Sequence, residues 1–216
     1  MIKIKPFVFN DFAVNSFVIY DETKECIIVD PGCNTKEQED ILSHFISENK
    51  LKPVKLLNTH CHVDHVAGNN FVVENYKTPV YANEGDVANL DASKRAGEIY
   101  GMKIKTPPAI DYYLNCNDVV KFGNSELSVL HVPGHSKGSI AFYAKDEKFI
   151  VVGDVLFNGS VGRTDLNGGS LDELMSSIKN RLFKLDDDVT VYTGHGPETT
   201  IGNEVRSNPF LLDNVM

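Results

Sequence analysis

The sequence lacks several features that would place it in broad functional classes. It has no run of basic residues and a formal net charge of −9, so neither a nucleic-acid partner nor a nuclease activity is expected. No apolar stretch approaches the about 20 residues of a membrane-spanning helix, and the N-terminal segment has no signal-peptide core. These absences predict a cytoplasmic protein without a membrane partner. Paired C-x-x-C spacing is also missing, which favours reduced thiols at Cys26, Cys33, Cys61 and Cys116.

The pattern of short apolar segments predicts the fold class. With 216 residues and no repeat or linker, residues 1–216 are expected to form a single domain. Short β-rich segments dominate both halves and helical patterns accompany them, which predicts an α/β fold with sheet packed on sheet and helices outside. The predicted strands are residues 16–20, 26–29, 54–58, 78–82, 119–122, 127–132, 140–144, 149–153 and 189–193.

Two capping boxes predict where helices begin. Thr35 with Gln38, and Ser170 with Glu173, have the spacing in which a hydroxyl and a side chain three residues later satisfy free backbone N–H groups. The second helix is expected to end near Lys184, because its apolar stripe stops there. Further helical patterns lie at residues 66–76 and in the first part of 83–111.

The most informative segment follows the predicted strand 54–58. There His60, His62, Asp64 and His65 form an H-x-H-x-D-H pattern, in a chain with only seven histidines. Neutral imidazole and carboxylate groups are ligands for zinc and similar divalent ions. This loop therefore predicts a metal site.

Three further candidate ligands share one local pattern, an apolar strand followed by a glycine. They are His135, Asp154 and His195. Glycine permits a sharp turn and a close approach of the backbone to a ligand. Seven protein ligands exceed what one reactive ion can use, whereas two ions can share them if one carboxylate bridges the pair. The expectation is two divalent ions, zinc first, with iron or manganese left open because nitrogen and oxygen ligands suit all three.

The remaining polar residues near these loops have weaker interpretations. His44, His131 and Cys61 are interpreted as surface, strand and packing residues. A centre with two dications, two carboxylates and one hydroxide would carry a net positive charge and attract an anionic substrate. Arg163 and Lys137 are the candidates to hold a substrate carboxylate. Alternatively, Arg163 forms an ion pair within the protein and Lys137 is a solvated loop residue.

Taken together, these motifs resemble the metallo-β-lactamase superfamily, and within it the glyoxalase II-like (hydroxyacylglutathione hydrolase-like) single-domain branch. The resemblance includes residues 153–157, 162–165 and 194–200 and covers nearly the whole chain. It implies a four-layered αββα sandwich, with Asp30 supporting the histidine loop. It also implies one ion held by His60, His62 and His135, a second held by Asp64, His65 and His195, and Asp154 bridging the two.

The function implied by this resemblance is hydrolysis of a small anionic thioester or related ester by a metal-bridging hydroxide, with Asp64 and Asp154 as the catalytic carboxylates. No G-x-S-x-G motif offers a competing serine nucleophile. Aspartate at position 154, where the family's true β-lactamases commonly have cysteine, argues against antibiotic hydrolysis.

Other features leave the substrate and the reaction open. Only residues 196–216 follow His195, so the glutathione-binding helical region of full-length glyoxalase II enzymes is not expected. The alternatives are a lactonase, a mononuclear iron persulfide dioxygenase using His60, His135 and Asp154, and a metal-binding domain without turnover. The oligomeric state is not readable from the sequence.

Overall fold

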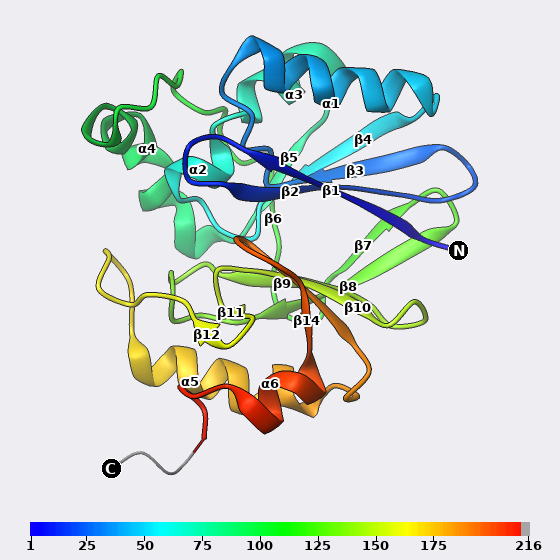
Figure 1. The fold of residues 1–216 in the computed structure, drawn as a ribbon. Coiled ribbons are helices and arrows are strands. Elements are labelled where there is room, and N and C mark those ends of the chain that lie inside the picture. The colour runs from blue at the N-terminus through cyan, green and yellow to red at the C-terminus, as the bar shows by residue number, and fades with distance from the viewer. Residues whose placement is uncertain (213–216) are drawn as a thin grey trace.

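Two six-stranded sheets packed face to face form the centre of the computed structural model, which describes residues 1–212 (Figure 1). The last four residues of the predicted domain, 213–216, lie outside the described part. The first sheet has the strand order β1-β2-β3-β4-β5-β6. Its strands are β1 (Lys3–Phe9), β2 (Val14–Tyr20), β3 (Glu25–Val29), β4 (Lys52–Leu57), β5 (Val80–Ala82) and β6 (Tyr112–Tyr113).

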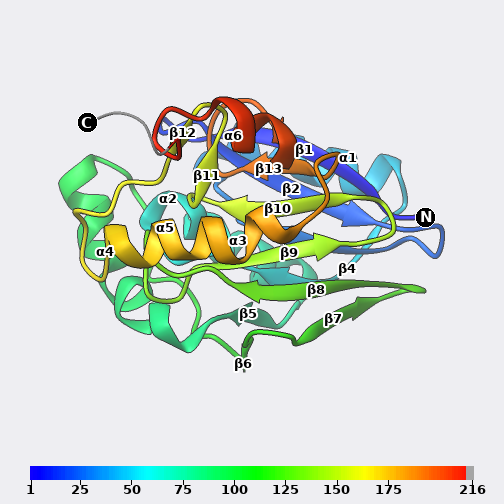
Figure 2. The same cartoon turned by 90° about the horizontal axis from the view of Figure 1, so that it is seen from below.

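The second sheet has the order β14-β13-β10-β9-β8-β7, and a separate hairpin of β11 and β12 lies beside it (Figure 2). Strands β10 and β13 pair in parallel, whereas the other neighbours in this sheet are antiparallel. The strands are β7 (Val119–Phe122), β8 (Ser125–His131), β9 (Ile140–Ala144), β10 (Phe149–Gly153), β11 (Leu156–Phe157), β12 (Ser160–Val161), β13 (Thr190–Thr193) and β14 (Thr199–Thr200).

Helices cover the outer faces of both sheets. Helices α1 and α3 lie over the first sheet, α5 and α6 lie over the second, and α2 and α4 lie near one end of the first sheet (Figures 1 and 2). The predicted αββα layering is therefore confirmed. Within the described range, no helix is both long and apolar enough to cross a membrane. The helices are α1 (Lys36–Glu48), α2 (Val63–Val66), α3 (Asn69–Tyr76), α4 (Val87–Tyr100), α5 (Leu171–Asn180) and α6 (Ile201–Ser207).

Alternation along the central strands explains why four layers form. On β2, Phe17 and Ile19 belong to the apolar cluster between the two sheets, whereas Val18 belongs to the cluster under α1 and α3. On the second sheet, Phe142 faces the first sheet and its neighbour Ala141 faces the α5 side. All five side chains are at most 1% exposed. Strands buried on both faces have near-continuous apolar sequences, which is the pattern seen here.

Strand β1 is the main difference from the sequence expectation, which assigns no element before residue 15. It pairs antiparallel with β2, from Lys3 opposite Tyr20 to Phe9 opposite Val14. Pro6 and alternating lysines weaken its apolar signal, and they are tolerated because β1 is an edge strand. The predicted strands 16–20 and 26–29 thus belong to a three-stranded antiparallel meander of β1, β2 and β3.

Three helix expectations need correction. The helix predicted at 66–76 begins only at Asn69, as α3, and the short helix α2 before it ends at Val66. Between them Gly68 donates its N–H to the carbonyl of Pro31 at 2.7 Å and interrupts the turn. Helix α5 ends at Asn180, and a 3₁₀ turn, Leu182–Lys184, completes the segment predicted as helix. Helix α6 was not expected; Thr200 caps it by accepting from the N–H of Asn203 at 3.1 Å.

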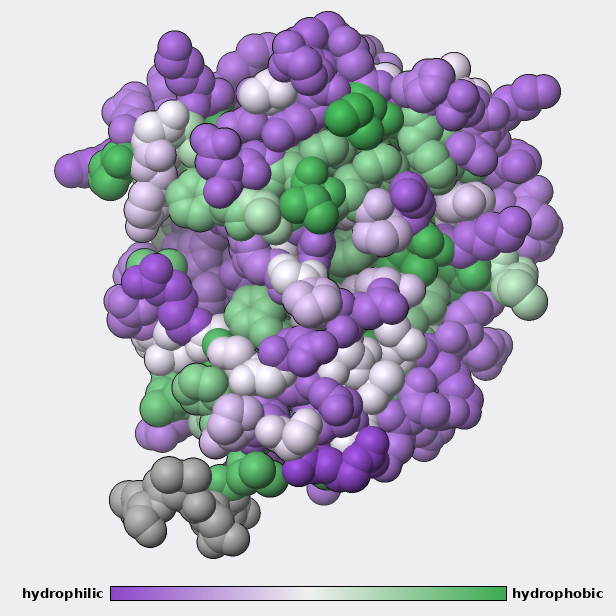
Figure 3. All heavy atoms as spheres, in the orientation of Figure 1, coloured by the Kyte–Doolittle hydropathy of each residue, from purple (hydrophilic) through white to green (hydrophobic). Residues whose placement is uncertain are grey.

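On the surface facing the viewer, a broad apolar patch lies between α1 and β1, and smaller apolar patches are scattered among the polar side chains (Figure 3). Val8 and Ile41 are its exposed members, at 64% and 53%, and Phe7 packs edge-on against Phe45 beneath them. Exposed single apolar side chains are normal on protein surfaces. Pro6, which has no N–H, interrupts the free edge of β1 beside this patch and disfavours pairing with another strand.

Asp21 links the two sheets at the end far from the histidine loop. Its carboxylate accepts hydrogen bonds from Thr23 N–H at 2.9 Å, from the Thr23 hydroxyl, from Asn124 N–H at 2.8 Å and from the Ser125 hydroxyl at 2.9 Å. Burial acts to raise the pKa of Asp21, but these hydrogen bonds outweigh burial and hold the pKa below its ordinary value of 3.8. The charged carboxylate is therefore favoured by folding.

We expect Asp21→Asn to lower the free energy of unfolding at pH 7 by about 1–3 kcal/mol, because donors are left facing an amide. Since folding depresses this pKa, the stabilisation is complete above the unfolded-state value and is lost as the pH falls through the folded-state value. Urea unfolding at pH 7 and pH 3 measures both points. A loss of unfolding free energy of equal size at pH 7 and pH 3 would contradict this role of Asp21. The control is Asp146→Asn, a change of an exposed aspartate.

Candidate metal centre

Loops at one end of both sheets bring all seven predicted ligand side chains together, and five of the seven line a cavity of about 330 Å³. His60 and His62 follow β4, and Asp64 and His65 lie on the short helix α2. The other three follow strands of the second sheet: His135 comes after β8, Asp154 after β10 and His195 after β13. The candidate site therefore lies where the two sheets present their loops to each other.

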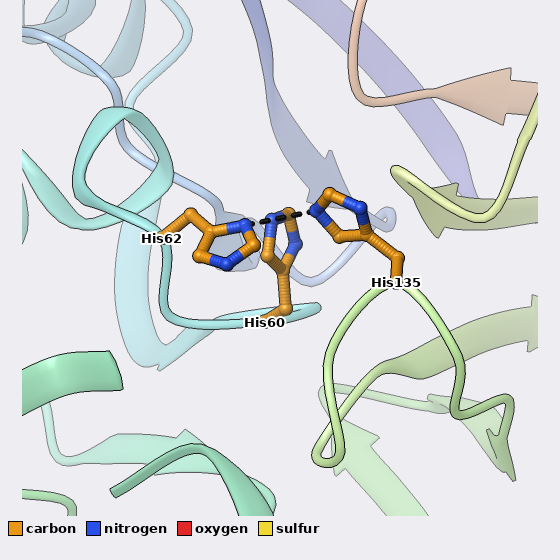
Figure 4. Close-up of side chains that lie close together, drawn as sticks. All are labelled: His60, His62 and His135. Carbon is orange, nitrogen blue, oxygen red and sulfur yellow. Dashed lines mark hydrogen bonds between the residues drawn. The ribbon is translucent and has the colours of Figure 1, made fainter. Parts of the chain in front are cut away.

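The side chains form two clusters. In the first, ligand atoms of His60, His62 and His135 lie within 4.8 Å of one another. His62 and His135 reach toward each other from different loops, with Nδ1 of one 2.8 Å from Nε2 of the other (Figure 4). In the second cluster, Asp64, His65 and His195 also lie within 4.8 Å.

Asp154 lies between the clusters and contacts both. Its Oδ1 is 3.3 Å from Nε2 of His65, and its Oδ2 is 3.4 Å from Nε2 of His195. The same Oδ2 is 3.7 Å from Nε2 of His135 in the first cluster. A carboxylate in this position can contribute one oxygen to each of two ions.

Hydrogen bonds on the outer side of the rings fix their tautomers. Nδ1 of His135 lies 2.9 Å from the carbonyl oxygen of Arg163, and Nδ1 of His195 lies 2.9 Å from that of Phe12. A carbonyl oxygen can only accept, so each Nδ1 carries the hydrogen. In the neutral ring the Nε2 lone pair then points into the centre, as a metal ligand requires.

Asp30 provides the same orientation for the second cluster. It is fully buried with a φ of 48°, and its Oδ2 accepts from Nδ1 of His65 at 3.0 Å. Oδ1 accepts from Thr59 N–H at 2.7 Å, and Oδ2 also accepts from the Thr59 hydroxyl at 2.5 Å. That hydroxyl lies 3.1 Å from Nδ1 of His60 and can accept its hydrogen.

Asp30, His60 and His65 also bring ligand atoms within 4.8 Å and could be taken for a third metal cluster. We reject this reading because both oxygens of Asp30 already accept hydrogen bonds and face the Nδ1 side of His65. The position of Asp30 instead suits a residue that supports the ligand loop.

Unsatisfied buried atoms show that the donor set fits cations. Among the described residues, the buried side-chain atoms without a hydrogen-bond partner are Nε2 of His60, Nε2 of His65, Oδ1 of Asp154 and Oγ1 of Thr78. The first three belong to the centre. An unpaired buried polar atom costs about 1–3 kcal/mol, and these three present lone pairs to one another. Divalent ions satisfy such groups, so the side chains fit a metal pair.

The electrostatics of the centre also favour cations. Burial acts to raise the pKa of Asp154, but the imidazoles of His65 and His195 outweigh it and hold this pKa well below its ordinary value. Burial lowers the pKa of His195, whereas its hydrogen bonds to Asp154 and Asp64 outweigh burial and raise the pKa to about 9. Protons and metal ions therefore compete for the same nitrogen.

Gly194 illustrates why glycine precedes a ligand here. A Cβ at Gly194 would overlap Oδ1 of Asp154, so only glycine lets this backbone pass the carboxylate. Gly153, with a φ of 55°, makes the turn that places Asp154. Both glycines thus do what the sequence pattern predicts, since one permits a close approach to a ligand and the other permits a sharp turn.

Comparison with known proteins decides the family. The sequence model of the Metallo-beta-lactamase superfamily matches residues 9–195. The chain belongs to this superfamily. It is 38% identical over 197 residues to the probable metallo-hydrolase YqgX of Bacillus subtilis, covering 90% of each chain. It is 35% identical over 207 residues to the hydroxyacylglutathione hydrolase GloC of Haemophilus influenzae, covering 93% of each.

Two solved structures of this superfamily are similar over almost the whole chain. One is described as the B3 metallo-beta-lactamase BLEG-1, with 35% identity, a TM-score of 0.89 and coverage of 97% of this chain and 100% of that one. The other is TTHA1623 in a di-iron-bound form, with 35% identity, a TM-score of 0.87 and coverage of 96% and 100%.

The structure separates the two predicted substrate-binding residues. In this metallo-β-lactamase fold, Arg163 lines the cavity, but its guanidinium makes two hydrogen bonds of 2.7 Å to Asp165. The side chain of Lys137 is exposed and does not line the cavity in the described part, and its carbonyl accepts from His131 at 2.9 Å. Of these two residues, Arg163 is therefore the one that lies at the cavity.

The other residues interpreted as structural lie away from the cavity lining. His44 is an exposed residue of α1 and pairs with Glu48 at 3.0 Å. Cys61, between two ligand histidines, is fully buried with Val66, Ala82 and Leu90. Burial raises the pKa of the Cys61 thiol well above its ordinary value, which makes it a packing residue.

Sequence reasoning missed the wall of the cavity opposite the ligands. Helix α4 forms it, and at its end Tyr100 packs edge-on against Phe12 from the β1–β2 turn, with ring centroids 5.6 Å apart. Small residues recurring at helical spacing were the available signal, but such a stripe is ordinary for a packed helix. The lining residues from α4 are Asn89, Ala92, Ser93, Ala96 and Tyr100.

Proposed function

We propose that this metal-dependent hydrolase is dinuclear and cleaves a small thioester or related ester. The observation that carries the proposal is the position of Asp154, whose carboxylate lies between the two clusters and contacts histidines of both. In this proposal Asp154 is shared by the two ions. One ion is held by His60, His62 and His135, and the other by Asp64, His65 and His195.

The protein's own residues prepare this centre for hydrolysis. When bound, two divalent ions supply a water of lowered pKa and Lewis acidity toward a carbonyl oxygen. Asp64 and Asp154 stay ionised, since neighbouring histidines lower both pKa values despite burial. Outer hydrogen bonds hold the histidine rings in the tautomer that presents a lone pair. A thiolate leaving group needs no strong general acid, since a thiol has a pKa of about 8.5.

The shape of the cavity supports an acyl substrate with an apolar part. Ala92 and Ala96 on α4 face the ligand side chains across the cavity and leave room for such a group. Arg163 stands at the lining beside them, where it can exchange Asp165 for a substrate carboxylate. The relative named hydroxyacylglutathione hydrolase supports a thioester of this kind.

A mononuclear iron oxygenase is the second candidate, as it would use His60, His135 and Asp154. The presence of Asp64, His65 and His195 in a second complete cluster favours two ions instead. The similar structure in a di-iron-bound form supports two ions as well, and it keeps iron beside zinc as a candidate metal.

We expect the protein to hydrolyse acyl thioesters with a kcat/KM at least about 100-fold above its kcat/KM for lactones or β-lactams. This ratio corresponds to about 2.7 kcal/mol in activation free energy. The metal content is measured on the same samples. A panel of acyl-glutathione, other thioesters, a lactone and a β-lactam tests this. Turnover of lactones or β-lactams alone would overturn the thioester assignment. One iron per chain with oxygen uptake on a persulfide would overturn the hydrolase assignment.

Ala96→Leu is the matched variant. The larger side chain should slow the hydrolysis of long acyl groups more than that of short ones, without altering the metal content.

A further inference from the structure

Asp86 is a fully buried acid that the sequence reasoning did not select. Its Oδ2 accepts from the N–H of Cys61 at 2.7 Å and from the hydroxyl of Ser136 at 3.0 Å. Its Oδ1 accepts from the N–H of Gly138 at 3.0 Å and from the side-chain amide of Asn89 at 3.2 Å. All four partners are donors, so the carboxylate uses both oxygens fully.

These contacts join the two loops that carry one ligand cluster. Cys61 stands between His60 and His62, and Ser136 follows His135 directly. One carboxylate therefore ties the backbone of the first loop to the backbone and side chain of the second. Asp30 makes the corresponding contacts to His65 in the other cluster. Each cluster thus has one buried aspartate behind it.

Two local features show that the side chain is directed to these loops. Asp86 occupies the N-cap position of α4, where an aspartate ordinarily accepts from a backbone N–H of its own helix. In the described structure its carboxylate makes no such backbone bond, and its contact within α4 is the side-chain amide of Asn89. Gly138 faces it so closely that a Cβ there would lie 2.6 Å from the Asp86 nitrogen and 2.8 Å from its Cγ. The loop after His135 can approach Asp86 only because residue 138 is glycine.

We propose that Asp86 is a positioning residue that fixes the distance between the His60–His62 loop and the His135 loop, and thereby sets the affinity of the three-histidine cluster for its ion. The inference rests on the proposed dinuclear centre. An asparagine at position 86 keeps the shape but has only one oxygen. Its NH₂ group faces either the N–H of Gly138 or the N–H of Cys61, so in both orientations one backbone N–H of a ligand loop loses its acceptor. The three rings then lose their fixed spacing.

The test compares Asp86→Asn with Asp21→Asn in the full chain. Asp21 is the matched control, because it is also a buried aspartate with four hydrogen bonds but lies at the opposite end of the sheets. Zinc affinity is measured by competition with a chromophoric chelator, and the geometry by the absorption spectrum of the cobalt-substituted protein. We expect Asp86→Asn to weaken one of two metal equivalents by about 10–100-fold and to change the cobalt spectrum. Asp21→Asn should keep both equivalents and the wild-type spectrum.

The outcomes separate this inference from the proposed function. A wild-type chain that binds no metal, or one ion only, defeats the dinuclear proposal and the inference with it. Two tight equivalents in both wild type and Asp86→Asn, with identical cobalt spectra, defeat the inference alone. If Asp86→Asn does not fold, Ser136→Ala removes one hydrogen bond from Asp86 and should weaken the same equivalent by a smaller factor. Wild-type affinity for both ions in Ser136→Ala would then count against the positioning role.

Discussion

Replacing Asp154 by alanine should abolish nearly all turnover and reduce bound metal below two ions per chain. The expected loss in kcat/KM exceeds the about 10–100-fold that loss of an outer-shell partner of a ligand costs. The reason is that Asp154 contacts His65 and His195 on one side and His135 on the other, so both clusters lose a ligand together. Steady-state kinetics and elemental analysis of the same preparation measure the two effects.

The control for this change is His44→Ala. His44 is an exposed residue of α1 whose Nε2 lies 3.0 Å from Oε1 of Glu48, and surface changes of this kind stay within about ±0.5 kcal/mol. Its metal content and kcat/KM should equal those of the wild type. Equal activity of the Asp154→Ala and His44→Ala proteins would refute the ligand assignment.

Removal of metal should lower the melting temperature by about 8–16 °C for each ion lost. An ion present at about 1,000 times its dissociation constant stabilises the folded state by about 4 kcal/mol. For a chain of this size each kcal/mol shifts the melting temperature by about 2–4 °C. The structural reason is that Nε2 of His60, Nε2 of His65 and Oδ1 of Asp154 are buried without hydrogen-bond partners. Calorimetry of chelator-treated protein, before and after zinc is restored, measures the shift.

The same measurement has a predicted pH dependence. Hydrogen bonds to Asp154 and Asp64 outweigh burial and raise the pKa of His195 to about 9. Below that pH a metal ion must therefore displace a proton from this ring. The stabilisation by zinc should therefore shrink as the pH falls. Magnesium, which prefers oxygen ligands, should not restore the melting temperature. Melting temperatures within 2 °C with and without zinc would show that the clusters hold no ion.

The sequence was most informative where residues close in the chain act together. The H-x-H-x-D-H loop is such a segment, since its spacing alone indicates a metal site. The near-continuous apolar sequences around β2 and β9 are another, because they indicate strands that are buried on both faces. Edge strand β1 and helix α6 were not predicted, because Pro6 in β1 and the polar face of α6 leave little periodic apolar signal.

Long-range contacts account for what the sequence did not reveal. Asp86 follows β5 and has a glycine, Gly85, directly before it, so the pattern that selected Asp154 also selects Asp86. Three of its four donors, however, come from residues 25 to 52 positions away, and no local pattern contains them. The carbonyl of Phe12, which orients His195 from 183 positions away, has no side-chain signal at all.

The sequence by itself determined the type of layers and the chemical character of the donor set, because strand periodicity and ligand identity are local properties of the chain. The tertiary structure decided which nitrogen of each histidine faces the centre, that Arg163 and not Lys137 reaches the cavity, and that α4 forms its far wall. Those outcomes depend on backbone carbonyls and carboxylates from distant segments. Only folding places these groups within hydrogen-bond distance, and it thereby selects one tautomer for each ring and one of the two basic residues for the cavity.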